Sequence, residues 1–222
     1  MGVFAMMISP EVFYEMNLKG KTADQIMTVI RGLKQEIGRL KNIVEHPEYE
    51  CTMRPSERTR ISCSQDYLER AKEALAEVGG NYVPSAAEKK EMEFDANIPF
   101  INKVEFCIGG YFGGYETRTY TIDGDKVHTD IEHSLILKPS NLGDYEIEEM
   151  DKDYLFESLK KLHIGGWRRN YSTKRFGYLV CDGTQWHLEI YFSNGAKPVK
   201  VYGDNAYPYN FDKVLELFEV EE

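Results

Sequence analysis

The sequence predicts an α+β fold in two parts, a helical region over 1–97 and a mostly antiparallel sheet with helices on one face over 98–222. Up to about residue 97, the apolar residues recur at intervals of three and four, which is the period of a helix. Beyond that point they alternate along short segments between glycine-rich turns, which is typical of strands in hairpins. We expect the element order βββ-α-ββ-α in the second part.

The composition is that of a globular protein, with 42% hydrophobic residues and a formal net charge of -10 over 222 residues. An acidic balance argues against nucleic acid and anionic lipid as partners, and it leaves either a basic partner or simple solubility as its reason. The four cysteines show no CxxC spacing, so reduced thiols and a cytoplasmic protein are expected. The apolar run at the start is too short for a signal peptide, and no run of about 18 apolar residues predicts a membrane span.

The first predicted helix begins at Ser9-Pro10-Glu11, with an apolar face from Val12, Phe13 and Met16. A longer helix over 22–45 follows, capped by Thr22. Its apolar residues alternate at spacings of four and three and form a heptad seam: Ile26, Ile30, Leu33, Ile37, Leu40 and Val44. A seam this narrow needs a partner helix, either in the same chain or in a second copy.

A second helix over 64–79 is the natural antiparallel mate for this seam, capped by Ser62 or Ser64 and ended by Gly79-Gly80. The alternative is a homodimer through helix 22–45. The segment 80–97 connects the two parts and contains a short helix opened by the capping box of Ser85 and Glu88.

The second part contains five expected strands and two helices. Gln185–Phe192 is the clearest strand, because Trp186, Leu188 and Ile190 point one way with Phe192. The other expected strands are 103–108, 115–122, 126–137 and 197–202, with a brief pairing at 178–181, and the expected helices are 151–163 and 211–218.

Two polar motifs near the end of the chain are candidate binding residues. Asp182, Thr184, Gln185 and Trp186 either surround a small pocket or form a turn in which the tryptophan fills the core. Asn205 and Tyr207 of the NAYP motif either contact a ligand or lead into the last helix.

Two further groups are candidates for recognition. Trp167 is followed by Arg168 and Arg169 in a basic run over 168–175, which could bind phosphate or an acidic peptide, or form a solvated loop. Tyr111, Phe112 and Tyr115 lie at a hairpin tip, where they are either exposed for recognition or folded onto the sheet.

No catalytic, metal-binding or cofactor-binding residue set is predicted. The five histidines lack a ligand spacing, and the glycines of GGYFGGY match no phosphate-binding loop. One arrangement leaves catalysis open: Cys181 is next to Asp182 and six residues from His187, so a thiol nucleophile with a nearby base is conceivable, with a buried structural thiol as the alternative.

The segments DGTQWHLEIYFSNG and GDNAYP, followed by a short helix, give the chain a family resemblance. From about Ile101 to Phe218 it resembles a Firmicutes-type bacterial family that has a DGTQW…G-x-NAYP C-terminal domain and no assigned activity. The resemblance implies a cytoplasmic bacterial setting and a domain boundary, and it transfers no catalytic residue.

These observations favour a non-catalytic binding or interaction module whose partner is a protein or a small molecule. Two alternatives remain at this point. One is a small hydrolase- or transferase-like enzyme with a pocket near Asp182 and His187. The other is a regulator associated with mobile elements that acts on a nucleic-acid enzyme through its acidic surface or the loop 168–175.

Overall fold

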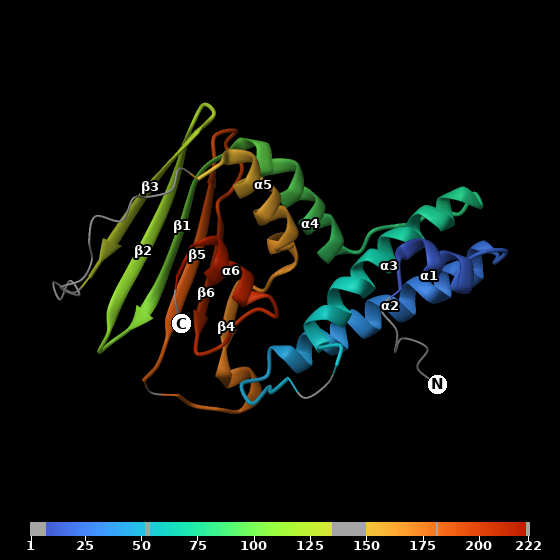
Figure 1. Cartoon of the computed structure of the whole chain (residues 1–222), viewed down its shortest axis with the longest axis horizontal. Helices are drawn as coiled ribbons and strands as arrows, with labels where there is room; N and C mark the ends of the chain where they lie inside the picture. The colour runs from blue at the N-terminus through green and yellow to red at the C-terminus, as the bar shows by residue number, and fades with distance from the viewer. Residues whose placement is uncertain (1–7, 52–53, 135–149, 181, 221–222) are drawn as a thin grey trace. The chain divides into compact units, whose positions relative to one another are not determined.

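The computed structural model describes residues 8–51, 54–134, 150–180 and 182–220 (Figure 1). These residues form six α-helices and a six-stranded, mostly antiparallel sheet, which confirms the α+β class. The chain divides into two compact units, Met1–Pro84 and Ser85–Glu222. The boundary between the units lies before helix α4 (Ala86–Asn97), whereas the sequence predicts it after residue 97. Helix α4 belongs to the second unit because its Phe94 packs into the core of that unit.

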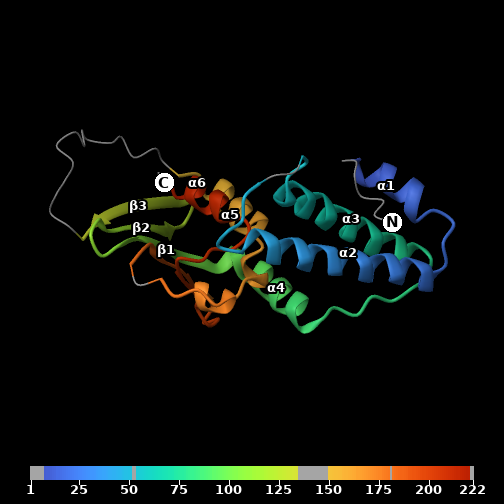
Figure 2. The same ribbon diagram turned by 90° about the horizontal axis from the view of Figure 1, so that it is seen from below.

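The first unit consists of α1 (Pro10–Asn17), α2 (Ala23–Val44) and α3 (Glu57–Glu77). Thr22 caps α2 as expected, and the backbone N–H of Thr22 donates a hydrogen bond to Gln25 Oε1. All six residues of the heptad seam are buried, and α2 lies beside α3 in both views of the fold (Figures 1 and 2). The seam therefore finds a partner helix within the same chain.

Helix α3 begins earlier than the expected residue 64. Ser56 is its N-cap and accepts a hydrogen bond from the Thr59 amide, so Ser62 and Ser64 lie inside the helix and do not cap it. The longer helix buries Ile61, which extends the apolar stripe by almost two turns.

In α1, only one residue of the predicted apolar face turns inward. Phe13 is buried and stacks on Tyr67 with ring centroids 4.4 Å apart, while Val12 and Met16 are exposed. A helix of two turns contacts its neighbour along one narrow line, so it has room for few buried positions.

The sheet of the second unit has the strand order β3-β2-β1-β5-β6-β4. All neighbouring strands are antiparallel except β4 and β6, which run parallel. The strands are β1 (Ile101–Gly110), β2 (Gly114–Asp123), β3 (Lys126–His133), β4 (Asn170–Ser172), β5 (Gln185–Phe192) and β6 (Val199–Asp204).

The strand β4 was not expected, because three residues are too few to show an alternating pattern. The pairing expected at 178–181 is absent over residues 178–180, which form no strand, and Cys181 lies outside the described residues. The last expected residues of the third strand, 135–137, also lie outside them.

Helices α5 (Lys152–Lys161) and α6 (Phe211–Leu217) lie with α4 against one face of the sheet (Figure 2). Phe218 packs on Phe106 of β1, and its ring stacks on Tyr120 of β2 with centroids 5.1 Å apart. Helix α5 buries Leu155 and Leu159, but Tyr154 is exposed, although its spacing in the sequence predicts that it lies on the same face of the helix. Across the described residues, no helix has both the length and the apolar character needed to cross a bilayer.

Candidate binding surface

The second face of the sheet is polar and aromatic. In β1 and β5, the alternate residues Val104, Phe106, Leu188 and Ile190 point to the core, so the residues between them point the other way. Directly paired residues share a face. The open face therefore comprises Lys103, Glu105 and Cys107 of β1, Tyr115, Thr117, Thr119 and Thr121 of β2, His128, Asp130 and Glu132 of β3, Asn170 and Ser172 of β4, Gln185, His187, Glu189 and Tyr191 of β5, and Lys200, Tyr202 and Asp204 of β6.

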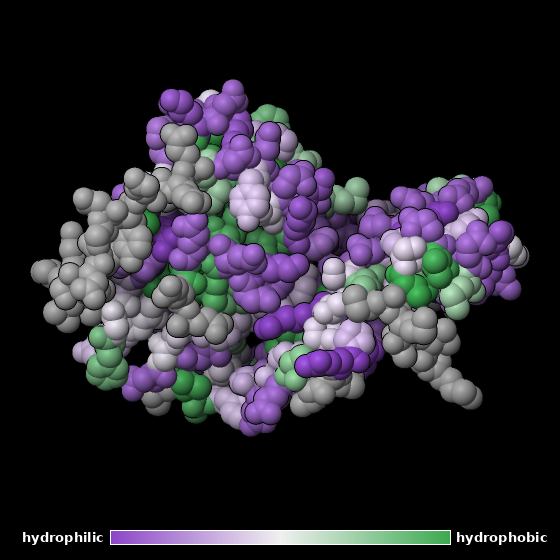
Figure 3. Space-filling view, in the orientation of Figure 1, coloured by the Kyte–Doolittle hydropathy of each residue, from purple (hydrophilic) through white to green (hydrophobic). Residues whose placement is uncertain are grey.

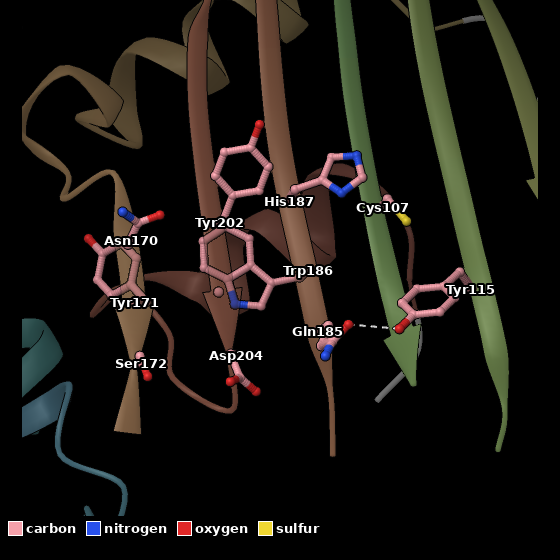
Figure 4. A pocket seen from close by; sticks show the side chains of 11 residues that line it. Cys107, Tyr115, Asn170, Tyr171, Ser172, Gln185, Trp186, His187, Tyr202 and Asp204 are labelled. Atoms are coloured by element: carbon pink, nitrogen blue, oxygen red, sulfur yellow. Dashed lines mark hydrogen bonds between the residues drawn. The ribbon is translucent and has the colours of Figure 1, made fainter. Parts of the chain in front are cut away.

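A depression of about 480 Å³ lies on this face, at the end of the sheet where β4, β5 and β6 meet (Figure 4). Five strands contribute to it. It is lined by Cys107, Tyr115, Asn170, Tyr171, Ser172, Gln185, Trp186, His187, Tyr202, Gly203 and Asp204. Of the candidate residues from the sequence, Tyr115, Gln185, Trp186 and His187 line it.

Hydrogen bonds and ring contacts fix several side chains of the depression. The Tyr115 hydroxyl donates to the Gln185 Oε1 at 2.8 Å, which connects β2 with β5 across β1. His187 lies between its neighbours, with its ring centroid 6.1 Å from that of Tyr202 and its Nε2 3.5 Å from Glu105 Oε1. Side chains fixed in this way lose little conformational entropy when a ligand binds.

Beside the depression, Glu189 is the centre of a network of donors on the open face. Its carboxylate accepts hydrogen bonds from Lys200 Nζ at 2.6 Å, from the Tyr202 hydroxyl at 3.0 Å and from the Tyr191 hydroxyl. Burial alone would raise the pKa of Glu189, but these three donors outweigh it and lower the pKa to about 2. The same hydrogen bond to Glu189 raises the pKa of Lys200.

This network predicts a specific loss of stability in acid. Because the pKa of Glu189 falls from its ordinary 4.5 to about 2 on folding, its contribution is complete above pH 4.5 and is lost as the pH falls towards 2. We expect Glu189→Gln to unfold more easily than the parent at pH 7, by about 2 kcal/mol, and most of this difference to be lost by pH 2.5. Urea unfolding at several pH values measures this difference. A gap that does not change with pH would contradict the lowered pKa.

The candidate residues Thr184 and Asn205 bind each other. The backbone N–H of Thr184 donates a hydrogen bond to the side-chain oxygen Oδ1 of Asn205, and the backbone N–H of Asn205 donates one to the Thr184 carbonyl oxygen, both at 2.9 Å. Gly183, at φ +159, passes so close that a β-carbon on it would lie 1.8 Å from Asn205 Oδ1. The two polar motifs therefore hold the start of β5 against the end of β6.

The remaining candidate residues lie outside the depression. Trp167 is buried and meets Trp186 edge to face at 6.5 Å, and its Nε1 has no hydrogen-bond partner among the described residues. Tyr207 packs on the Phe211 ring at 4.7 Å. Arg168, Arg169 and Asp182 are exposed, and Cys181 lies outside the described residues.

The hairpin tip between β1 and β2 is exposed. Tyr111 and Phe112 are 82% and 80% exposed, whereas Tyr115 turns towards the open face. Apolar surface is visible at this tip in Figure 3. The loop before β5 meets the hairpin there, because a β-carbon on Gly110 would lie 2.9 Å from the Gly183 carbonyl oxygen, and this loop exposes Leu179.

The sequence did not single out Cys107, Tyr202, Gly203 and Asp204 of the depression, and it marked Asn170, Tyr171 and Ser172 only as part of the basic run 168–175. The alternation of the last strand could have placed Tyr202 and Asp204 on the polar face. No local signal marks the others, because they meet only once the strand order is known.

Comparisons with protein-family models, with curated proteins and with solved structures found no match to this chain. The described residues of the depression offer rings, amides, hydroxyls and one carboxylate on strands, which can bind and orient a ligand.

Proposed function

We propose that this chain is a non-catalytic binding module that holds a segment of a partner protein, or a small molecule, on the open face of its sheet. The make-up of the depression carries the proposal: tyrosine, tryptophan, asparagine, serine and glutamine predominate. Tyrosine, serine and asparagine predominate in antibody paratopes, where rigid rings supply contact area and small polar groups supply adaptable hydrogen bonds. The cytoplasmic bacterial setting and the family resemblance belong to the same proposal.

The position of the depression also supports the proposal. It lies on strands and not on long loops, so its geometry is fixed before a ligand arrives. The exposed rings of Tyr111 and Phe112 stand at the same end of the sheet and would extend the contact area of a protein partner.

One contact favours the enzyme alternative. His187 Nε2 lies 3.5 Å from Glu105 Oε1, and a carboxylate in that position can orient a catalytic imidazole. A hydrolase- or transferase-like enzyme would then use His187 in the depression, without Asp182, which does not line it. Turnover of a defined substrate that disappears in His187→Gln would establish this alternative.

The proposal is tested by selecting ligands from a random peptide library displayed on phage, with the full chain as bait. For the peptides recovered, we expect Tyr202→Ala to weaken the Kd at least about tenfold, since exposed tyrosines at the centre of a contact carry much of its free energy. Tyr202→Phe separates the ring from its hydrogen bond to Glu189 and is expected to stay within about threefold of the parent.

The matched control is Tyr154→Ala, which removes an exposed tyrosine of α5, outside the depression. Tryptophan fluorescence of each variant verifies that the second unit is folded. Peptides that bind the parent and Tyr202→Ala equally well would refute the proposal, and a library that yields no binder would refute a peptide segment as the ligand.

A further inference from the structure

The depression contains a carboxylate that no cation neutralises among the described residues. Among the residues that the structure describes, Asp204 is the only acidic side chain that lines it. Its Oδ1 accepts a hydrogen bond from Asn205 Nδ2 at 2.9 Å, which orients the group, and its Oδ2 has no partner within the described part of the chain. An oriented carboxylate with an unused oxygen can accept a charge-assisted hydrogen bond from a ligand.

Two rings stand in the same depression as this carboxylate. Tyr202 comes from the same strand as Asp204 and is 44% exposed. Tyr115 comes from β2 and points its hydroxyl towards Gln185, which lies between Tyr115 and Asp204 (Figure 4). The face of a tyrosine ring attracts a cation by its quadrupole. Gln185 and Asn170 add amide oxygens, which also accept from N–H donors.

The nearby lysines of the open face are already engaged. Lys200 Nζ lies 2.6 Å from Glu189, and Lys103 Nζ lies 2.9 Å from Glu105. Arg168 and Arg169 precede β4 and are exposed, but they do not line the depression. The negative charge of Asp204 therefore dominates the electrostatic potential within the depression. This potential favours a cationic ligand over an anionic one.

We propose that the depression binds the cationic side chain of a lysine or arginine in a basic partner segment, with Asp204 as counter-ion and the rings of Tyr202 and Tyr115 as its platform. This inference rests on the proposed binding function and specifies the chemistry of the ligand. The net charge of -10 would also speed the approach of such a partner.

The test uses three small probes of similar shape and different charge: n-butylguanidinium, the neutral n-butylurea and the anionic pentanoate. Each is titrated into the ¹⁵N-labelled full chain while the amide resonances of 170–172, 185–187 and 202–204 are followed. We expect butylguanidinium to shift these resonances with a Kd of order 1 mM, butylurea to bind at least about tenfold more weakly, and pentanoate not to bind there.

Variants of the carboxylate complete the test. Asp204→Asn is expected to weaken butylguanidinium about tenfold and to leave butylurea unchanged, while Asp130→Asn, an exposed carboxylate of β3 on the same face, leaves both unchanged. Equal or tighter binding of butylurea or pentanoate, no effect of Asp204→Asn, or no shift at about 50 mM butylguanidinium would each overturn the inference. Phage peptides that depend on Tyr202 but contain no lysine or arginine would overturn it while leaving the binding function intact.

Discussion

Replacing Trp186 by alanine is expected to lower the free energy of unfolding of the second unit by about 3–5 kcal/mol, the range for an emptied aromatic core site. The indole is 2% exposed and meets the ring of Phe211 at 4.8 Å and that of Tyr171 at 5.9 Å. Its Nε1 donates to the Ala206 carbonyl at 3.0 Å, a bond that the variant also loses. The backbone of Gly203 packs directly on the indole, because a β-carbon there would lie 1.9 Å from Nε1, and a glycine has no side chain that could fill the emptied space.

Urea unfolding followed by tryptophan fluorescence measures this change. Both tryptophans of the chain lie in the second unit, so Trp167 still reports on it in the variant. Trp186→Phe is the control, since it keeps much of the apolar volume and loses the donor, and we expect it to cost about 1–2 kcal/mol. A loss below about 1 kcal/mol for Trp186→Ala would mean that the ring does not fill the core.

Replacing Leu33 by alanine is expected to lower the free energy of unfolding of the first unit by about 2–5 kcal/mol. Leu33 is 1% exposed in the middle of the heptad seam. Far-UV circular dichroism measures this change, because α1, α2 and α3 contain more than half of the residues in the described α-helices.

The matched control on the same helix is Gly38→Ala. A β-carbon at Gly38 meets nothing within 4 Å, so alanine there should stabilise the helix by about 0.5–1 kcal/mol. Because the seam is buried within the chain, the unfolding midpoint of the parent should not depend on protein concentration. A midpoint that rises with concentration would support the homodimer through helix 22–45.

The elements that the sequence predicted well are those with local signals. Thr22, the expected N-cap, marks the start of α2, and the alternation of Trp186, Leu188 and Ile190 marks β5. Such signals depend on neighbours in sequence and need no knowledge of the tertiary structure.

The depression could not be predicted, because it depends on which strands become neighbours. Asn170 and Tyr202 lie far apart in sequence and pair only in the parallel contact of β4 with β6. Tyr154 shows the same limit for packing: its spacing fits the inner face of α5, but the structure leaves it exposed. The sequence shows the two motifs that contain Thr184 and Asn205, but it does not show that these two residues form hydrogen bonds with each other.

The strand order has a consequence for synthesis of the protein. The central strand β1 pairs with β2 directly along the chain, but its other neighbour, β5, begins only at Gln185. Until β5 has left the ribosome, β1 lacks its second neighbour and forms an exposed edge of the sheet made by β1, β2 and β3. Exposed edge strands can pair with other chains, which leads to aggregation. The helices before Pro84 depend on contacts of shorter range, so we expect them to fold first and the sheet to close only after β5 and β6 have been synthesised.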